Sequence, residues 1–322
     1  MKVLVTGGTS WFGQSIVARL LARGHDVACY DEVVEPWRVV LTRPVRCHRG
    51  SLADMAGLLA VVRRERPEVI VNREVRYGED TETDVIGTVQ INLLGALHVF
   101  EAAAATGIRR VVYESSIGVY GTQEEHGDRL LGEDDARFCN PRWVFRLTQH
   151  AVEALAPRMA ASSGIELVGV RPSVCHSPLK DKGVSRWSND FMSLPATGRP
   201  MRFPYPASQR TSLIWVDDAA EVYAALADAP RLAHPIYNTG GYDVSLGELA
   251  GMVRRMIPDA QFDFAEEGSV PPQPMPSRVC GARVERELGL SLAPLEQTLA
   301  LHAEQARRMF AAAPITHPSN GR

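Results

Sequence analysis

Short β-branched segments alternate with longer amphipathic ones throughout the first half of the chain. Strand-like segments such as KVLVTG, HDVACYD, EVIVN, RRVVYESS and IELVGVRP are separated by helix-length segments such as QSIVARLLARG and TVQINLLGALHVFEAAAATG. Such alternation is typical of βαβ units, in which parallel strands share one sheet with helices on its faces. Gly24, Gly107 and Gly164 follow helical patterns at the position where a glycine ends a helix. The sequence therefore predicts an α/β fold built on a doubly wound, parallel Rossmann sheet.

The pattern changes after Arg171, where Pro and Gly become frequent and the alternation weakens. We therefore predict a Rossmann domain over residues 1–171 and a smaller C-terminal substrate lobe over residues 172–322. The segment PIYNTGG has the pattern of a strand that returns to the sheet. A returning segment near residues 213–241 is expected for that reason, and the two parts should be interleaved.

Composition argues against several classes of function. The net charge is −3 and no long basic block is present, so no nucleic-acid partner is expected. No apolar run approaches the roughly 20 residues that a membrane span needs, so no membrane partner is expected either. The five cysteines are scattered and odd in number, which argues against a disulfide framework and a metal site and favours the cytoplasm. The expected partner is a small molecule.

A glycine-rich loop separates the first predicted strand from the first predicted helix. VLVTGGTSWFGQSIVARLL places Gly7, Gly8 and Gly13 there, where backbone N–H groups and a helix N-terminus can approach a pyrophosphate. Asp31 ends the second predicted strand, 18 residues after Gly13, where a carboxylate can accept hydrogen bonds from an adenosine ribose. The same carboxylate would repel a ribose 2′-phosphate. These residues predict a dinucleotide cofactor and favour NAD over NADP.

These features resemble an extended short-chain dehydrogenase/reductase of the NAD-dependent epimerase/dehydratase type, over nearly the whole chain. TGGTSWFG is similar to the family's TGxxGxxG, INLLGALHVFEAA resembles its NxxG helix, and VRPSVCHSP is similar to its RPxxVYGP segment. VVYESSIGVYG resembles the strand and loop that carry the active-site Ser or Thr, which is Ser116 by its spacing from Tyr120. The resemblance implies a homodimer that pairs through two helices of the Rossmann domain. It also implies an NAD site formed by Gly7, Ser10, Trp11, Phe12, Gly13, Asp31 and Asn92.

The catalytic pair of this family is missing. NPRWVFRLTQHAVEAL aligns with the family's PxxxYxxxKxxxE through Pro141 and Glu153, which puts Phe145 at the tyrosine position and Gln149 at the lysine position. None of the eight tyrosines has a lysine four residues later, and residues 3–179 contain no lysine. In the family the tyrosine, with its pKa lowered by the lysine, transfers a proton as hydride moves. A positioned general acid or base is worth about 10²–10⁴ in rate, so ordinary turnover needs another proton donor.

Several residues are candidates for replacing the lost pair. The Ser116 hydroxyl can hydrogen-bond a carbonyl or alkoxide oxygen, or it only satisfies backbone groups. NREV stands where the family has HLAA, and it puts Arg73 and Glu74 at the strand edge where ligands bind. These two either supply acid–base function or pair with each other. Tyr120 can donate its phenol proton, or it only packs. Gln149 can still hydrogen-bond ribose hydroxyls.

The segment SRWSNDFMSLPATGRPMRFPYPASQR is expected to line the substrate pocket, by the same resemblance. Arg186, Trp187 and Arg210 in this segment, together with Arg73 and Arg142, are candidates for binding an anionic or aromatic group. The alternative is that they are ordinary surface residues.

Three hypotheses for function follow, in order of preference. The first is an atypical NAD-binding, epimerase/dehydratase-like oxidoreductase that acts on a polar small molecule, with proton transfer assigned to Ser116, Tyr120, Glu74 or the substrate itself. The second is a non-redox isomerase, lyase or dehydratase on the same fold, with Glu74 as the base. The third is a catalytically inactive pseudoenzyme with a binding role.

Overall fold

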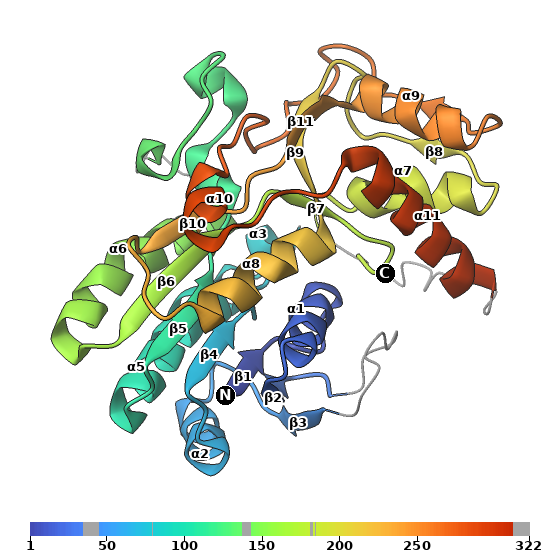
Figure 1. The fold of residues 1–322 in the computed structure, drawn as a ribbon. Helices are drawn as coiled ribbons and strands as arrows, with labels where there is room; N and C mark the ends of the chain where they lie inside the picture. The colour runs from blue at the N-terminus through green and yellow to red at the C-terminus, as the bar shows by residue number, and fades with distance from the viewer. Residues whose placement is uncertain (35–44, 79, 137–142, 181–182, 184, 312–322) are drawn as a thin grey trace.

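The computed structural model describes residues 1–34, 45–78, 80–136, 143–180, 183 and 185–311. Within this part of the chain, seven parallel strands form one sheet in the order β10-β6-β5-β4-β1-β2-β3 (Figure 1). The strands are β1 (Lys2–Thr6), β2 (Asp26–Asp31), β3 (Arg46–Arg49), β4 (Val69–Asn72), β5 (Arg110–Glu114), β6 (Glu166–Arg171) and β10 (Ile236–Asn238). The predicted doubly wound Rossmann sheet is confirmed.

Helices cover both faces of this sheet, which is why its central strands read as almost continuous apolar runs. On one face Val5 packs into a core formed with α1 (Trp11–Ala22) and α8 (Val216–Asp228). On the other face Leu4 packs into a core formed with α2 (Met55–Glu65), α5 (Ala96–Thr106) and α6 (Val144–Ser163). Because α8 and β10 come from the second half of the chain, the two halves are interleaved. The domain boundary near Arg171 stays a prediction.

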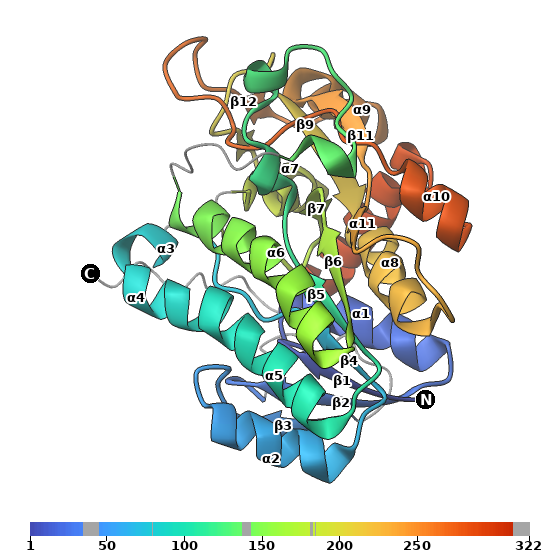
Figure 2. The same cartoon turned by 90° about the vertical axis from the view of Figure 1, so that its left-hand side faces the viewer.

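A long helical rod precedes β5. It consists of α4 (Val85–Thr88), the π-helical segment η1 (Val89–Gly95) and α5, and the short helix α3 (Asp80–Thr83) comes just before it. By length and composition alone, Val85–Thr106 would be able to cross a membrane. In the fold the rod packs against α2 and lies beside α6 (Figure 2). An apolar helix of a soluble core has the same composition, and the absence of a membrane partner stays a prediction.

The remaining elements build a second lobe with its own core. β7 (Val174–His176), β9 (Arg210–Trp215) and β11 (Tyr242–Ser245) form one small sheet, and β8 (Met201–Arg202) pairs with β12 (Phe262–Asp263). Helices α7 (Trp187–Ala196), α9 (Leu246–Met256) and α11 (Leu295–Ala311) complete it, whereas α10 (Ala282–Leu288) packs against α8 and β10 of the main sheet. The 3₁₀ turns η2 (Ile117–Tyr120), η3 (Gln123–His126) and η4 (Glu133–Asp135) follow β5, and residues of η2 pack into the core of this lobe. β7 directly follows β6, so the lobe begins at the carboxyl edge of the main sheet.

Candidate functional site

The glycine-rich loop between β1 and α1 keeps the close backbone approach of a dinucleotide cradle. Gly7 has a φ of +65°, and a Cβ placed on it would lie 2.9 Å from the Cα of Glu74. A Cβ on Gly13 would lie 2.0 Å from the Gly7 carbonyl oxygen. Ser10 caps α1, because its Oγ accepts a hydrogen bond from the Gly13 N–H at 3.1 Å and donates one to the Gly7 carbonyl at 2.7 Å. The serine at the middle glycine position therefore stabilises the loop.

Asp31 organises the same loop from the end of β2. Its Oδ2 accepts hydrogen bonds from the N–H of Thr9 at 3.1 Å and from the hydroxyl of Thr9 at 2.7 Å, and its Oδ1 accepts one from the N–H of Val33 at 3.1 Å. A carboxylate can accept about four hydrogen bonds. Asp31 therefore keeps capacity for a ligand hydroxyl, while most of its capacity already fixes the loop.

Glu74 turns toward this cradle and not toward the cavity described below. Burial, and then the negative charges of Asp31 and Glu32, raise its pKa well above the usual range. Its Oε2 is buried and has no hydrogen-bond partner among the described residues. The surroundings of Glu74 therefore favour the neutral form of its carboxyl over the charged form. The structure does not bring it together with Ser116.

A cavity of about 150 Å³ opens at the carboxyl ends of β4, β5 and β6, against the second lobe. Its volume is similar to that of a cavity that holds one benzene ring, so it can accept a ring-sized group. Its walls combine aromatic side chains, three cations and several hydroxyls, contributed by the glycine loop, by the segments after β4, β5 and β6, and by α6. They include Trp11, Phe12, Arg73, Tyr77, Glu114, Ser116, Phe145, Arg146, Ser173, Cys175, Lys180, Ser185 and Met275. Ligands of open α/β sheets bind at this edge.

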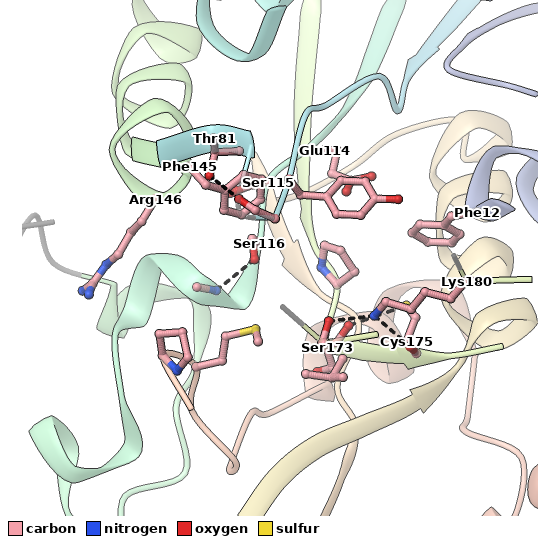
Figure 3. Close-up of a pocket in the computed structure, with 18 of the residues that line it drawn as sticks. Phe12, Thr81, Glu114, Ser115, Ser116, Phe145, Arg146, Ser173, Cys175 and Lys180 are labelled. Atoms are coloured by element: carbon pink, nitrogen blue, oxygen red, sulfur yellow. Dashed lines mark hydrogen bonds between the residues drawn. The ribbon is translucent and has the colours of Figure 1, made fainter. Parts of the chain in front are cut away.

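Ser116 and Phe145 lie in this cavity. The Oγ of Ser116 accepts a hydrogen bond from the Gly118 N–H at 3.0 Å and caps η2. Among the described residues its hydroxyl hydrogen has no acceptor, so it is available to a ligand oxygen. Phe145 lies on the side of the cavity opposite Lys180 and Cys175 (Figure 3).

Gln149 lies one helical turn beyond Phe145 on α6 and is only 1% exposed. Its amide nitrogen and oxygen are both buried and have no hydrogen-bond partner within the described part of the chain. An unpaired buried amide costs about 1–3 kcal/mol for each lost partner, so this position is built to meet a polar ligand or water. It is the position at which the family resemblance predicts contact with ribose hydroxyls.

Tyr120 and Asn92 serve the protein's own hydrogen-bond networks. The Tyr120 hydroxyl accepts from Arg171 at 2.8 Å and donates to the Asn238 Oδ1 at 2.9 Å, and burial raises the pKa of Tyr120 to about 12. Arg171 also donates two hydrogen bonds, of 2.8 and 2.7 Å, to the Glu153 carboxylate. Asn92 pairs with the backbone of Arg76 through bonds of 2.7 and 2.8 Å. Neither Tyr120 nor Asn92 lines the cavity.

The predicted substrate residues of the second lobe are also placed elsewhere. Arg186 is exposed at the start of α7 and lies 3.4 Å from Asp190. Trp187 is buried in the core of the second lobe. Arg210 pairs with Asp243 at 2.7 Å and borders a separate surface hollow. Arg142 lies outside the described residues.

Arg73 and Glu114 form a buried ion pair at the cavity wall, a pair that the sequence did not predict. Arg73 is 3% exposed, its guanidinium lies 5.0 Å from the centre of the Phe12 ring, and its Nε lies 2.8 Å from a Glu114 oxygen without an aligned hydrogen bond. Burial raises the pKa of Glu114 to about 7, against the opposing effects of Arg73 and the Tyr223 hydroxyl. Glu114 is therefore a carboxyl that can change its protonation state near neutral pH.

Lys180 is the functional candidate that the sequence reasoning missed. It is 4% exposed, lines the cavity, and donates to the hydroxyls of Ser185 at 2.7 Å and Ser188 at 3.1 Å. Burial lowers its pKa to about 8. A signal was present, because the chain has only three lysines and one of them follows the segment that resembles RPxxVYGP.

Comparisons with known proteins show the family and the fold of the chain. The model of the "NAD dependent epimerase/dehydratase family" matches residues 3–240. A "3-diazoavenalumate denitrifying reductase" from Streptomyces sp is 30% identical over 246 residues, which are 73% of this chain and 75% of that protein. A UDP-glucose 4-epimerase from Vibrio cholerae is 24% identical over 77% of this chain and 73% of its own length. The crystal structure of a Thermus thermophilus UDP-glucose 4-epimerase in complex with NAD superposes with a TM-score of 0.83 at 24% identity, covering 95% of this chain and 99% of that one.

Proposed function

The chain belongs to the NAD-dependent epimerase/dehydratase family, and from that premise we propose that it is an oxidoreductase that acts on a polar small molecule containing a ring. The observation that carries the proposal is the cavity, which is lined by both the Ser116 hydroxyl and the aromatic residues of the glycine loop. The hydroxyl suits a substrate oxygen, and the aromatic walls suit a ring.

The residues present fit a nicotinamide cofactor, and we propose NAD over NADP. Only glycine fits at positions 7 and 13, because neighbouring backbone atoms occupy the space that a Cβ would need. The tightly packed loop that results would present its backbone N–H groups to the pyrophosphate. Asp31 would accept a ribose hydroxyl and repel a 2′-phosphate. The unpaired amide of Gln149 would meet the second ribose. When bound, the cofactor accepts or supplies hydride.

The chain's own residues would bind and orient the substrate. Ser116 would donate a hydrogen bond to the substrate oxygen, and the positive charges of Arg73 and Lys180 would stabilise negative charge that develops on it. Phe12 and Phe145 would exclude water from the ring-sized space. Tyr120 is less suited to proton transfer, because its hydroxyl already pairs with Arg171 and Asn238.

Two other functions compete with this proposal. One requires Glu74 as a catalytic base, and the other assumes that the protein has no catalytic activity. A non-redox isomerase, lyase or dehydratase would use Glu74 as base, but burial and then the charges of Asp31 and Glu32 raise the pKa of Glu74 well above the usual range. It also lies apart from the cavity that Ser116 lines. An inactive pseudoenzyme would have no need of titratable groups such as Glu114 in that cavity.

Calorimetric titration with NAD, NADH and NADPH tests the cofactor assignment. We expect NAD and NADH to bind more tightly than NADPH, and Asp31→Asn, which removes the charge but keeps an acceptor for Thr9, to reduce this preference. Asp54→Asn, at the exposed N-cap of α2, is the matched control and should leave the preference unchanged. A folded protein that binds no dinucleotide would refute the proposal. Binding without hydride transfer to any of a panel of aldehydes and ketones would favour the isomerase, lyase or pseudoenzyme function.

We also propose that the protein is a homodimer. The rod of α4, η1 and α5 carries the exposed residues Val85, Ile86 and Leu94, and the neighbouring helix α6 carries exposed Leu147, with exposed Trp143 just before it. We name these five residues the helical patch. Exposed apolar side chains gathered on two adjacent helices favour association with a second copy of the same surface.

A further inference from the structure

We propose that Lys180 is the proton-transfer group of this cavity, in place of the tyrosine and lysine that positions 145 and 149 lack. The lysine comes from the segment between β7 and α7, so the second lobe and not α6 would supply the acid. This inference rests on the proposed oxidoreductase function.

The geometry holds the Lys180 amine at the cavity wall. Its three N–H groups face the Ser185 hydroxyl at 2.7 Å, the Ser188 hydroxyl at 3.1 Å and the Cys175 carbonyl at 3.4 Å, and its Nζ lies 5.3 Å from the centre of the Trp11 ring. Ser188 donates its own hydrogen to the Cys175 and Ser185 carbonyls. Among the residues that the structure describes, Ser185 has no such acceptor, so its hydroxyl can donate to Nζ once the amine is neutral. Ser185 also lines the cavity, which gives the proton a path through that hydroxyl.

The surroundings favour exchange of this proton near neutral pH. Burial is the main cause that lowers the pKa of Lys180 to about 8, and the positive charge of Arg73, after β4, adds to it. Cys175 on β7 opposes the shift in the pKa of Lys180, His176 stays neutral, and Glu114 on β5 balances the charge of Arg73. Both protonation states of the amine are therefore populated around pH 8. General acid–base groups are most effective under such conditions.

The step is a proton transfer coupled to reduction of a carbonyl group. The substrate carbon accepts hydride from a reduced nicotinamide, while the Ser185 hydroxyl gives its proton to the substrate oxygen and takes one from the Lys180 ammonium, whose N–H bond breaks. The electron pair of the broken bond stays on Nζ. The carbonyl compound is reduced to an alcohol, the nicotinamide is oxidised, and the amine regains its proton from water through Ser185.

Titration of the lysine amines by NMR tests the proposal without turnover. Because the chain has three lysines, selective ¹³C,¹⁵N-lysine labelling gives three resolvable signals, and Lys180→Met assigns one of them. We expect the signal of Lys180 to titrate near pH 8. If none of the three lysine signals titrates near pH 8, the proposal is overturned even if no variant folds.

Turnover of an aldehyde or ketone with NADH supplies the second test. We expect Lys180→Ala to lower kcat by about 10²–10⁴-fold, ethylamine but not guanidinium to restore part of it, and the wild-type pH profile of kcat/KM to follow the NMR titration. Ser188→Ala, which removes a partner of the amine outside the cavity wall, should lower kcat far less. If Lys180→Ala keeps kcat within threefold, the lysine is structural and only this inference fails. If the wild type transfers no hydride, the proposed function fails, and this inference fails with it.

Discussion

At the scale of single residues, neighbours in sequence take different places around the site. Successive side chains of an extended segment point to opposite sides. Arg73 therefore reaches the cavity and Glu114, whereas Glu74 turns toward Asp31 and the glycine loop. The sequence pattern identified the segment but not the direction of each side chain. Lys180 was missed because a single lysine in an irregular segment has no periodicity that indicates burial.

Arginines in the second lobe illustrate the same difficulty. Arg186 and Arg210 stand in the segment expected to line the pocket, but carboxylates on the surface of the same lobe pair with them. The pair of Arg186 with Asp190 follows from a spacing of four residues at the start of one helix. The pair of Arg210 with Asp243 depends on the folded structure, because these residues are far apart in the sequence. Ser116 and Phe145 were easier to place from the sequence, because Ser116 lies two residues beyond strand β5 and Phe145 lies in the first turn of helix α6. Their catalytic roles stay predictions.

Replacement of Ser116 is the sharpest residue-scale prediction. Ser116→Ala should lower kcat by about 10²–10³-fold with a small change in KM, because the lost donor acts mainly on charge that develops in the transition state. Ser116→Thr keeps the hydroxyl and should retain most activity. Steady-state kinetics with NADH and the best carbonyl substrate would measure both. Equal kcat values for Ala and wild type at unchanged melting temperature would assign Ser116 to backbone capping alone.

At the scale of elements, β1, β2, β4, β5 and β6 were predictable because almost all their residues are buried and form apolar runs, whereas the mostly exposed β3 was not predicted. The second lobe was less predictable, since β8 and β12 have two residues each and β7 has three. Segments this short are fixed by packing in the folded molecule and carry little pattern of their own. The strand in PIYNTGG was found because its apolar residues enter the main sheet beside β6.

A buried histidine pair that joins β7 to α11 predicts sensitivity to acid. His176 and His302 stack with their Nδ1 atoms 3.1 Å apart, and burial lowers the pKa of His176 to about 3 and that of His302 well below its usual value. Below pH 6.5 the unfolded chain binds protons that the folded chain does not. The free energy of unfolding should therefore fall as the pH drops from about 6.5 toward 3.

Urea unfolding at pH 7.5, 6.0 and 5.0 would measure this effect. His302→Gln keeps a partner for Ser193 and removes one titrating group, so its stability should fall less steeply with pH than that of the wild type. His126 is only partly buried and lies outside the histidine pair, so the variant His126→Gln is the control and should keep the wild-type slope. If His302→Gln and wild type have the same pH dependence, the pair does not set the acid sensitivity.

At the scale of the whole molecule, the helical patch predicts a dimer that one charge can disrupt. Leu94→Asp or Leu147→Asp should shift the mass measured by light scattering from that of two chains to that of one, because burying an unpaired carboxylate costs several kcal/mol. Leu130→Asp, at an exposed leucine outside the helical patch, should leave the mass unchanged. A wild-type protein that has the mass of one chain at micromolar concentration would contradict the prediction.

The interleaving of the two halves also has a consequence for synthesis on the ribosome. When residue 171 has been translated, six strands of the main sheet exist, but helix α8 and the edge strand β10 do not. The nascent chain then exposes the apolar face that α8 will cover and the open edge of β6. It cannot close its first core until about residue 238 has left the exit tunnel. A pause in translation before that point would leave a half-covered sheet in contact with chaperones, and a fragment that ends at residue 171 should be insoluble.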